Sequence, residues 1–110
     1  MRVTHSQYLA DVGAKKLIIA AKAEAGRRIL EILPDWKQRN LTARAVEIVN
    51  AKYDQTATSA DLVELSDIAE IFAQVKAIRS ASDLIEGDIA AGLVTTTDQV
   101  KKSSRWPSIK

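Results

Sequence analysis

A row of isoleucine and valine side chains between residues 59 and 92 restricts the fold of this chain more than any other feature. Apolar residues recur there at alternating steps of three and four, with only Ser82 interrupting, at Ile68, Ile71, Val75, Ile78, Ile85 and Ile89. This spacing predicts one long amphipathic helix with a buried stripe. Such a helix would be about 50 Å long, whereas a compact domain of 110 residues has a radius of gyration of about 13 Å. We therefore expect the helix to bend or end at Gly87, or to project and meet a partner.

Composition supports a fold made of helices. The chain is 46% hydrophobic but contains only one Phe, two Tyr and two Trp, and it is rich in Ala, Ile and Leu. Such a composition favours helices over strands. The sequence predicts an all-α fold, a helical hairpin or three-helix arrangement over residues 1–94, with a long third helix and an extended C-terminal tail over residues 95–110.

Two earlier helices are expected, separated by a proline. Pro34 disfavours helical geometry at the residue before it, so the first helix ends near Leu33. Asp35 is expected to cap a turn that carries Trp36, and a second helix then runs to Tyr53.

The chain after the third helix loses its helical period at Gly92. One more turn is expected from Thr97 or Asp98 through Val100. The remainder reads as an extended tail, in which Trp106 is the only anchor.

The two halves of the third helix differ in their apolar surface. A second apolar line runs through the first half only, at Leu62, Leu65, Ala69 and Phe72. The first half is therefore expected to pack on two sides, against the first and second helices. The second half has fewer partners within the chain, so Ile78, Ile85 and Ile89, together with Trp106, are predicted to form an assembly interface. Alternatively, the first helix folds back along the whole length and covers these isoleucines.

Charge is unevenly distributed although the net charge is only +2. Residues 1–54 carry ten Lys/Arg and six Asp/Glu, residues 55–92 carry two and seven, and residues 93–110 carry four and one. An acidic middle between basic flanks indicates attraction within a hairpin or between subunits, as in a homo-oligomer. The alternative is that these are solvated faces that happen to differ.

The residues offer no constellation for catalysis, a cofactor or a metal. His5 is the only histidine and cysteine is absent, so neither a hydrolytic triad nor a Cys/His metal site is expected. The acidic group Asp83, Glu86 and Asp88 lacks the alternating ligand loop of a calcium site. No membrane association is expected either, because the apolar run after Lys16 stops at Lys22.

A nucleic-acid interface is also not expected. Basic residues do gather around Trp36, at Arg27, Arg28, Lys37, Arg39 and Arg44. However, phosphate-binding helices usually belong to a clearly basic domain, and here the following helix is acidic.

Two segments taken together carry a family resemblance. Residues 34–47, PDWKQRNLTARAVE, and residues 75–83, VKAIRSASD, resemble a pattern found in small helical proteins of tailed bacteriophages and prophages, often encoded near tail-fibre genes. The resemblance implies a non-catalytic structural component of the virion, in the tail, tail-fibre or adaptor region. It also implies synthesis in the bacterial host cytoplasm, other virion proteins as partners, and no active site to transfer.

The resembling segments suggest a structural role for three residues. In this hypothesis Trp36 packs at the hairpin corner, and Arg39 and Arg79, with Asn40, tie the neighbouring helices by polar contacts. Two other functions remain open, a tail-fibre assembly chaperone and a small DNA-binding or packaging protein.

Overall fold

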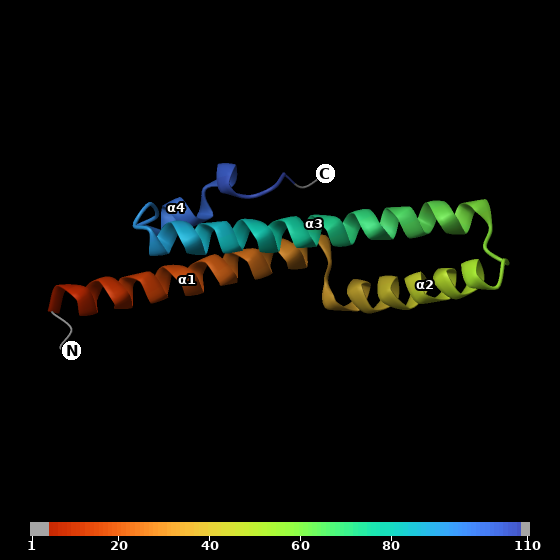
Figure 1. Cartoon of the computed structure of the whole chain (residues 1–110), viewed down its shortest axis with the longest axis horizontal. Helices are drawn as coiled ribbons and strands as arrows, with labels where there is room; N and C mark the ends of the chain where they lie inside the picture. The colour runs from red at the N-terminus through yellow and green to blue at the C-terminus, as the bar shows by residue number, and fades with distance from the viewer. Residues whose placement is uncertain (1–4, 109–110) are drawn as a thin grey trace.

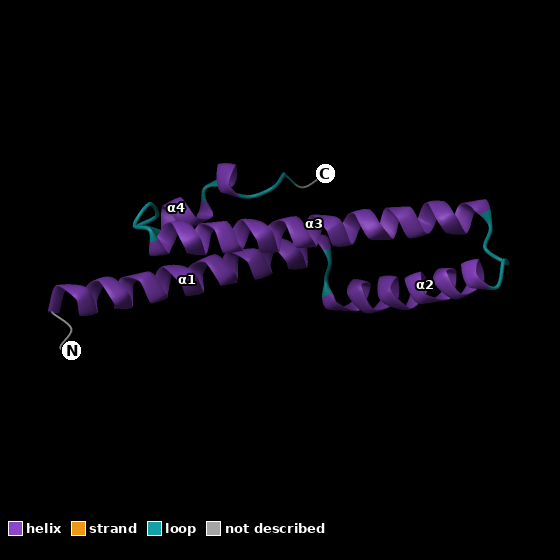
Figure 2. Ribbon diagram, viewed as in Figure 1, coloured by secondary structure: helices purple, strands orange, loops and turns teal. Residues whose placement is uncertain are grey.

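The computed structural model confirms an all-α fold with a long third helix. It describes residues 5–108, and the side chains of residues 12–108. Within that range no strand occurs, and the helices are α1 (His5–Ile32), α2 (Asp35–Tyr53), α3 (Ser59–Ala90), α4 (Thr97–Lys101) and a 3₁₀ turn at Ser103–Arg105 (Figure 2). The turn expected from Thr97 or Asp98 through Val100 is thus present as α4.

The molecule is a rod built around α3. Its dimensions are 65 × 30 × 22 Å and its radius of gyration is 19.5 Å, well above the value of about 13 Å for a compact chain of this length. Helices α1 and α2 lie one after the other along α3, and α3 runs antiparallel to both (Figure 1). The helix continues through Gly87 to Ala90, and two shorter helices share its length (Figure 1).

The rod has two halves, which we name here. The closed half contains α1, the C-terminal part of α3 from Val75 onward, and residues 91–108. The hairpin half contains α2 and the N-terminal part of α3, residues 59–74. Figure 1 shows them at opposite ends of the molecule.

The continuous apolar core lies in the closed half. Its buried members come from α1, α3 and the C-terminal segment, and they are Ala21, Ala25, Ile78, Ala81, Ile85, Ile89, Val94, Val100 and Trp106. Alanines on α1 have no bulk beyond Cβ, so α1 can approach α3 closely. Burial of these residues is the main source of stability for this end of the rod.

This core corrects the predicted assembly interface. Ile78, Ile85, Ile89 and Trp106 are only 1 to 5% exposed, so they are covered within one chain and cannot contact another. The physical reason is the alternative left open by the sequence, since α1 folds back along this part of α3. The C-terminal segment then covers what α1 leaves open.

The C-terminal segment is fastened to the closed half and is not a separate unit. A capping box joins Thr96 and Gln99 at the start of α4. The indole Nε1 of Trp106 donates a hydrogen bond of 2.8 Å to the carbonyl oxygen of Val100. Arg105 donates to Asp88 of α3 at 2.9 Å. The predicted boundary between a helical domain ending at residue 94 and a separate tail therefore divides one core. Trp106 is one of several residues that anchor the C-terminal segment.

The corner between α1 and α2 is filled by Leu33. This side chain is 2% exposed, whereas Trp36 is 60% exposed. Pro34 has extended backbone angles, with φ −56° and ψ 153°, so the chain changes direction between the two residues. The predicted packing of Trp36 in this corner is therefore wrong.

Candidate interaction surface

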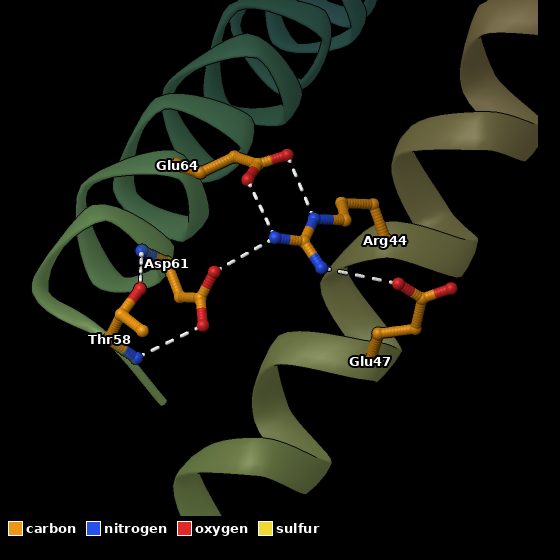
Figure 3. A network of polar contacts seen from close by, with 5 residues as sticks. All are labelled: Arg44, Glu47, Thr58, Asp61 and Glu64. Carbon is orange, nitrogen blue, oxygen red and sulfur yellow. Dashed lines mark hydrogen bonds and ion pairs between the residues drawn. The ribbon is translucent and has the colours of Figure 1, made fainter. Parts of the chain in front are cut away.

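An arginine clamp joins α2 to α3 in the hairpin half. The guanidinium of Arg44 donates two hydrogen bonds of 3.0 Å to the two carboxylate oxygens of Glu64 and one of 2.9 Å to Asp61, as Figure 3 shows. A further bond of 3.2 Å reaches Glu47 on the same helix. These acceptors, Glu64 first, raise the pKa of Arg44. Bidentate pairing fixes the orientation of both helices as well as their distance.

The start of α3 is tied to the same clamp. The hydroxyl of Thr58 accepts a 3.0 Å hydrogen bond from the backbone N–H of Asp61. In return, the backbone N–H of Thr58 donates to the Asp61 carboxylate at 3.0 Å (Figure 3). This donation is the main reason why the pKa of Asp61 lies below its ordinary value, with Arg44 contributing. Asp61 thus both caps α3 and pairs with α2.

Few side chains are fully buried between the two helices of the hairpin half. Ile48 on α2 is 1% exposed and Ile68 on α3 is 4% exposed. They mark the direction in which each helix faces the other. The apolar seam is therefore narrow, and the Arg44 clamp runs along one side of it.

The opposite side of the seam carries several apolar residues together with the exposed Lys52. Each residue advances about 100° around a helix, so Arg44 lies about 40° to one side of Ile48 and Val49 about 100° to the other. On α3 the same rule places Glu64 about 40° to one side of Ile68 and Leu65 about 60° to the other. In an antiparallel pair, equal senses of rotation face the same side of the pair. The clamp and the apolar residues therefore lie on opposite faces of the hairpin.

We call this apolar side the hairpin face. It is formed by Val46, Val49 and Tyr53 of α2 and by Leu62, Leu65 and Ala69 of α3. Four of these are large side chains in contact with solvent, since Val46 is 55%, Val49 52%, Tyr53 89% and Leu62 44% exposed. Exposed apolar side chains gathered on one face of a chain are typical of a protein interaction site.

The sequence contained a signal for this surface that the prediction did not use. Val46, Val49 and Tyr53 follow one another at steps of three and four residues. The structure turns Val49 and Tyr53 to solvent, although Ile48 beside them is buried. The expected packing of the first half of α3 on two sides is wrong for Leu62, which is 44% exposed.

The three residues assigned to the hairpin corner do not meet. Trp36 and Arg39 are exposed on α2. Arg79, together with Gln38 and Val75, borders a hollow of about 410 Å³ where α1, α2 and α3 come together. Neither arginine forms a hydrogen bond or ion pair with another described side chain, so Arg44 carries the link predicted for them. The two resembling segments do adjoin, because Gln38 belongs to one and Arg79 to the other.

Other basic residues near the corner are occupied by carboxylates. Glu24 is 6% exposed and accepts hydrogen bonds from Arg27 at 2.6 Å and Arg28 at 2.8 Å. These bonds, that from Arg27 first, hold the pKa of Glu24 below its ordinary value against the opposing effect of burial. Arg28 also stands 5.2 Å from the ring centroid of Trp106. Arg27, Arg28 and Arg44 of the predicted basic patch thus serve contacts within the chain.

The acidic residues near the end of α3 are likewise engaged in ion pairs. Glu86 lies 3.7 Å from Lys22, beyond hydrogen-bonding distance, and Asp88 pairs with Arg105 at 2.9 Å. Among the described residues no three His, Cys, Asp or Glu side chains gather as metal ligands do. The side chain of His5 lies outside the described part of the chain.

No described helix has the length and apolar character required to cross a membrane. The chain matches no protein-family model, no curated protein and no solved structure in the comparisons made.

Proposed function

We propose that this chain is a non-catalytic structural component of a bacteriophage particle, in the tail, tail-fibre or adaptor region. It acts by packing helices against neighbouring proteins. The observation that carries the proposal is the hairpin face, an apolar surface presented at one end of a rod 65 Å long. The resemblance of residues 34–47 and 75–83 to small phage tail-region proteins supplies the biological setting.

The hairpin face suits this role because it is held in place before any partner binds. The bidentate Arg44–Glu64 pair and the capping box at Thr58 fix α2 against α3. A surface ordered in advance loses less conformational entropy on binding than a flexible one. Each copy can therefore join an assembly without a folding step of its own.

Mass spectrometry of purified particles tests the proposal. We expect the polypeptide to be present at a fixed ratio to the other tail proteins, after synthesis in the host cytoplasm. Absence from finished particles, combined with co-purification with an unassembled tail-fibre protein, would contradict the proposal and identify an assembly chaperone instead.

A DNA-retention assay tests the competing nucleic-acid role. Arg27, Arg28 and Arg44 are each paired with carboxylates, which leaves Lys37 and Arg39 of the predicted basic patch for phosphates. We expect no retention on DNA at moderate salt. Strong retention that falls steeply as salt rises would favour a packaging protein over the structural role.

A further inference from the structure

We infer that the hairpin face is the contact between two copies of this chain, which pair through their α2–α3 hairpins to form a four-helix bundle. The inference deepens the proposed function and rests on it for the role of helix packing. It adds the identity of the first partner, which is a second copy.

The architecture of the hairpin half leaves one layer missing. Protein domains bury their apolar faces between at least two packed layers. In the closed half, α1 and the C-terminal segment both pack on α3. In the hairpin half, α2 and α3 form a single layer, with Ile48 and Ile68 in its seam. A second hairpin laid on the apolar side supplies the missing layer and completes a four-helix bundle.

The side of the hairpin that carries the hairpin face is large enough for a specific dimer. Helix α2 has 19 residues, which gives it a length of about 28 Å. Two helices side by side at their usual spacing make a face about 18 Å wide. This whole side of the hairpin, polar residues included, therefore measures about 500 Å² in projection, and two copies together reach the value of about 1,000 Å² that a specific interface requires. Protruding side chains such as Val49 and Tyr53 raise the buried area further.

Charge at the rim of the face suits a second copy. Arg39 lies nine residues before Ile48, about 180° around α2, and Glu70 lies two residues after Ile68, about 200° around α3. Both side chains are exposed and stand at the outer edges of the hairpin. When α2 of one copy covers α3 of the other under two-fold symmetry, Arg39 faces Glu70 at both rims. The contact is then self-complementary, as an isologous dimer requires.

Light scattering or sedimentation equilibrium of the full chain across the micromolar range tests the inference. We expect twice the mass of one chain. Val49→Glu places a charge inside the face and should raise the dimer dissociation constant about tenfold or more. Val63→Glu is the matched control, because Val63 is 62% exposed but lies on α3 away from the hairpin face. That variant should remain dimeric.

A cross-linking experiment makes the test independent of stability. The chain has no cysteine, so Val49→Cys, Leu62→Cys and Val63→Cys each introduce one thiol. Each Val49 should lie against α3 of the other copy, so oxidation of a mixture of Val49→Cys and Leu62→Cys chains should link two copies, whereas oxidation of Val63→Cys chains should not. Arg39→Glu should weaken the dimer, and adding Glu70→Arg should restore it, since the rim charges are then exchanged.

The outcomes separate this inference from the proposed function. A monomer at every concentration, or a dimer that Val49→Glu and Val63→Glu weaken equally, overturns the pairing of hairpin faces. Neither result changes whether the polypeptide occurs in the particle. Conversely, a dimer through Val49 in a protein absent from particles keeps the interface and contradicts the virion role.

Discussion

The two halves of the rod use the same helix in different ways. In the closed half, α3 places Ile78, Ile85 and Ile89 in a core completed by α1 and the C-terminal segment. In the hairpin half, α3 buries Ile68 against α2 and leaves Leu62 at the surface. The difference teaches that an apolar stripe shows which side of a helix must be covered, whereas the length and path of the other segments decide whether the chain itself covers it.

Removing the anchor of the closed half, Trp106, should have the largest effect on stability. Trp106→Ala should lower the free energy of unfolding by about 3–5 kcal/mol, because a large buried ring is lost and the core is left open. Chemical denaturation measures this change. Trp106→Phe is the control, which keeps an aromatic ring but loses the hydrogen bond to Val100, a bond worth about 1 kcal/mol. A cost below that of the control would show that the C-terminal segment does not hold the core together.

A matched pair of isoleucine truncations compares the two halves directly. Ile85 and Ile48 are each 1% exposed. Ile85→Ala should cost about 4 kcal/mol and Ile48→Ala about 2 kcal/mol, the upper and lower parts of the usual range for such truncations. The physical reason is that the single-layer hairpin can relax around the gap, whereas the closed core cannot. Equal losses in urea denaturation of the two variants would show that both halves are packed alike.

Helix capping offers a smaller and more local test. Thr58→Ala removes the side-chain cap of α3 and should cost about 1 kcal/mol. Because Asp61 also pairs with Arg44, hydrogen exchange should accelerate along α2 as well as in the first turn of α3. Thr96→Ala removes the equivalent cap of α4 and serves as the control, with faster exchange confined to the C-terminal segment. If Thr58→Ala leaves α2 unchanged, the clamp does not depend on the cap.

The smallest expected effect is a dependence of stability on acid. The pKa values of Glu24 and Asp61 are lowered in the folded chain, so the unfolded chain takes up protons first as pH falls. The stabilisation is complete above the ordinary carboxyl range and is lost as pH falls through that range to the lowered values. Denaturation midpoints measured from neutral pH downward should fall, and Glu24→Gln should make the decline shallower. A wild-type midpoint that rises on acidification would contradict both ion-pair assignments.

Much of the fold can be predicted from the sequence because the residues that separate and pattern its helices act on their neighbours along the chain. Pro34 separates α1 from α2, and the apolar period predicts α3 to within a few residues of its observed ends. These features depend on neighbours along the chain, so local rules suffice for them.

The packing and the candidate surface were less accessible to prediction. Periodicity alone does not reveal that α1 covers Ile85, since that depends on the approach of two helices far apart in sequence. The Arg44–Glu64 pair spans twenty residues, and its choice over Arg39 and Arg79 follows from helix phase across the hairpin. Helical phase also separates Val46, Val49 and Tyr53 from the buried side of α2, because these residues follow helical spacing on its outer side.

The continuity of α3 gives the molecule a fixed torsional relation between its ends. This helix runs without interruption over 32 residues, and one added residue turns everything beyond it by about 100°. An alanine inserted after Ala73 would turn the α3 residues of the hairpin half about 100° out of phase with those of the closed half. The connection between α1 and α2, at Leu33 and Pro34, is too short to follow this turn, so one set of helix contacts would be lost. The number of α3 residues between the two halves therefore sets the direction in which the hairpin half faces relative to the closed half.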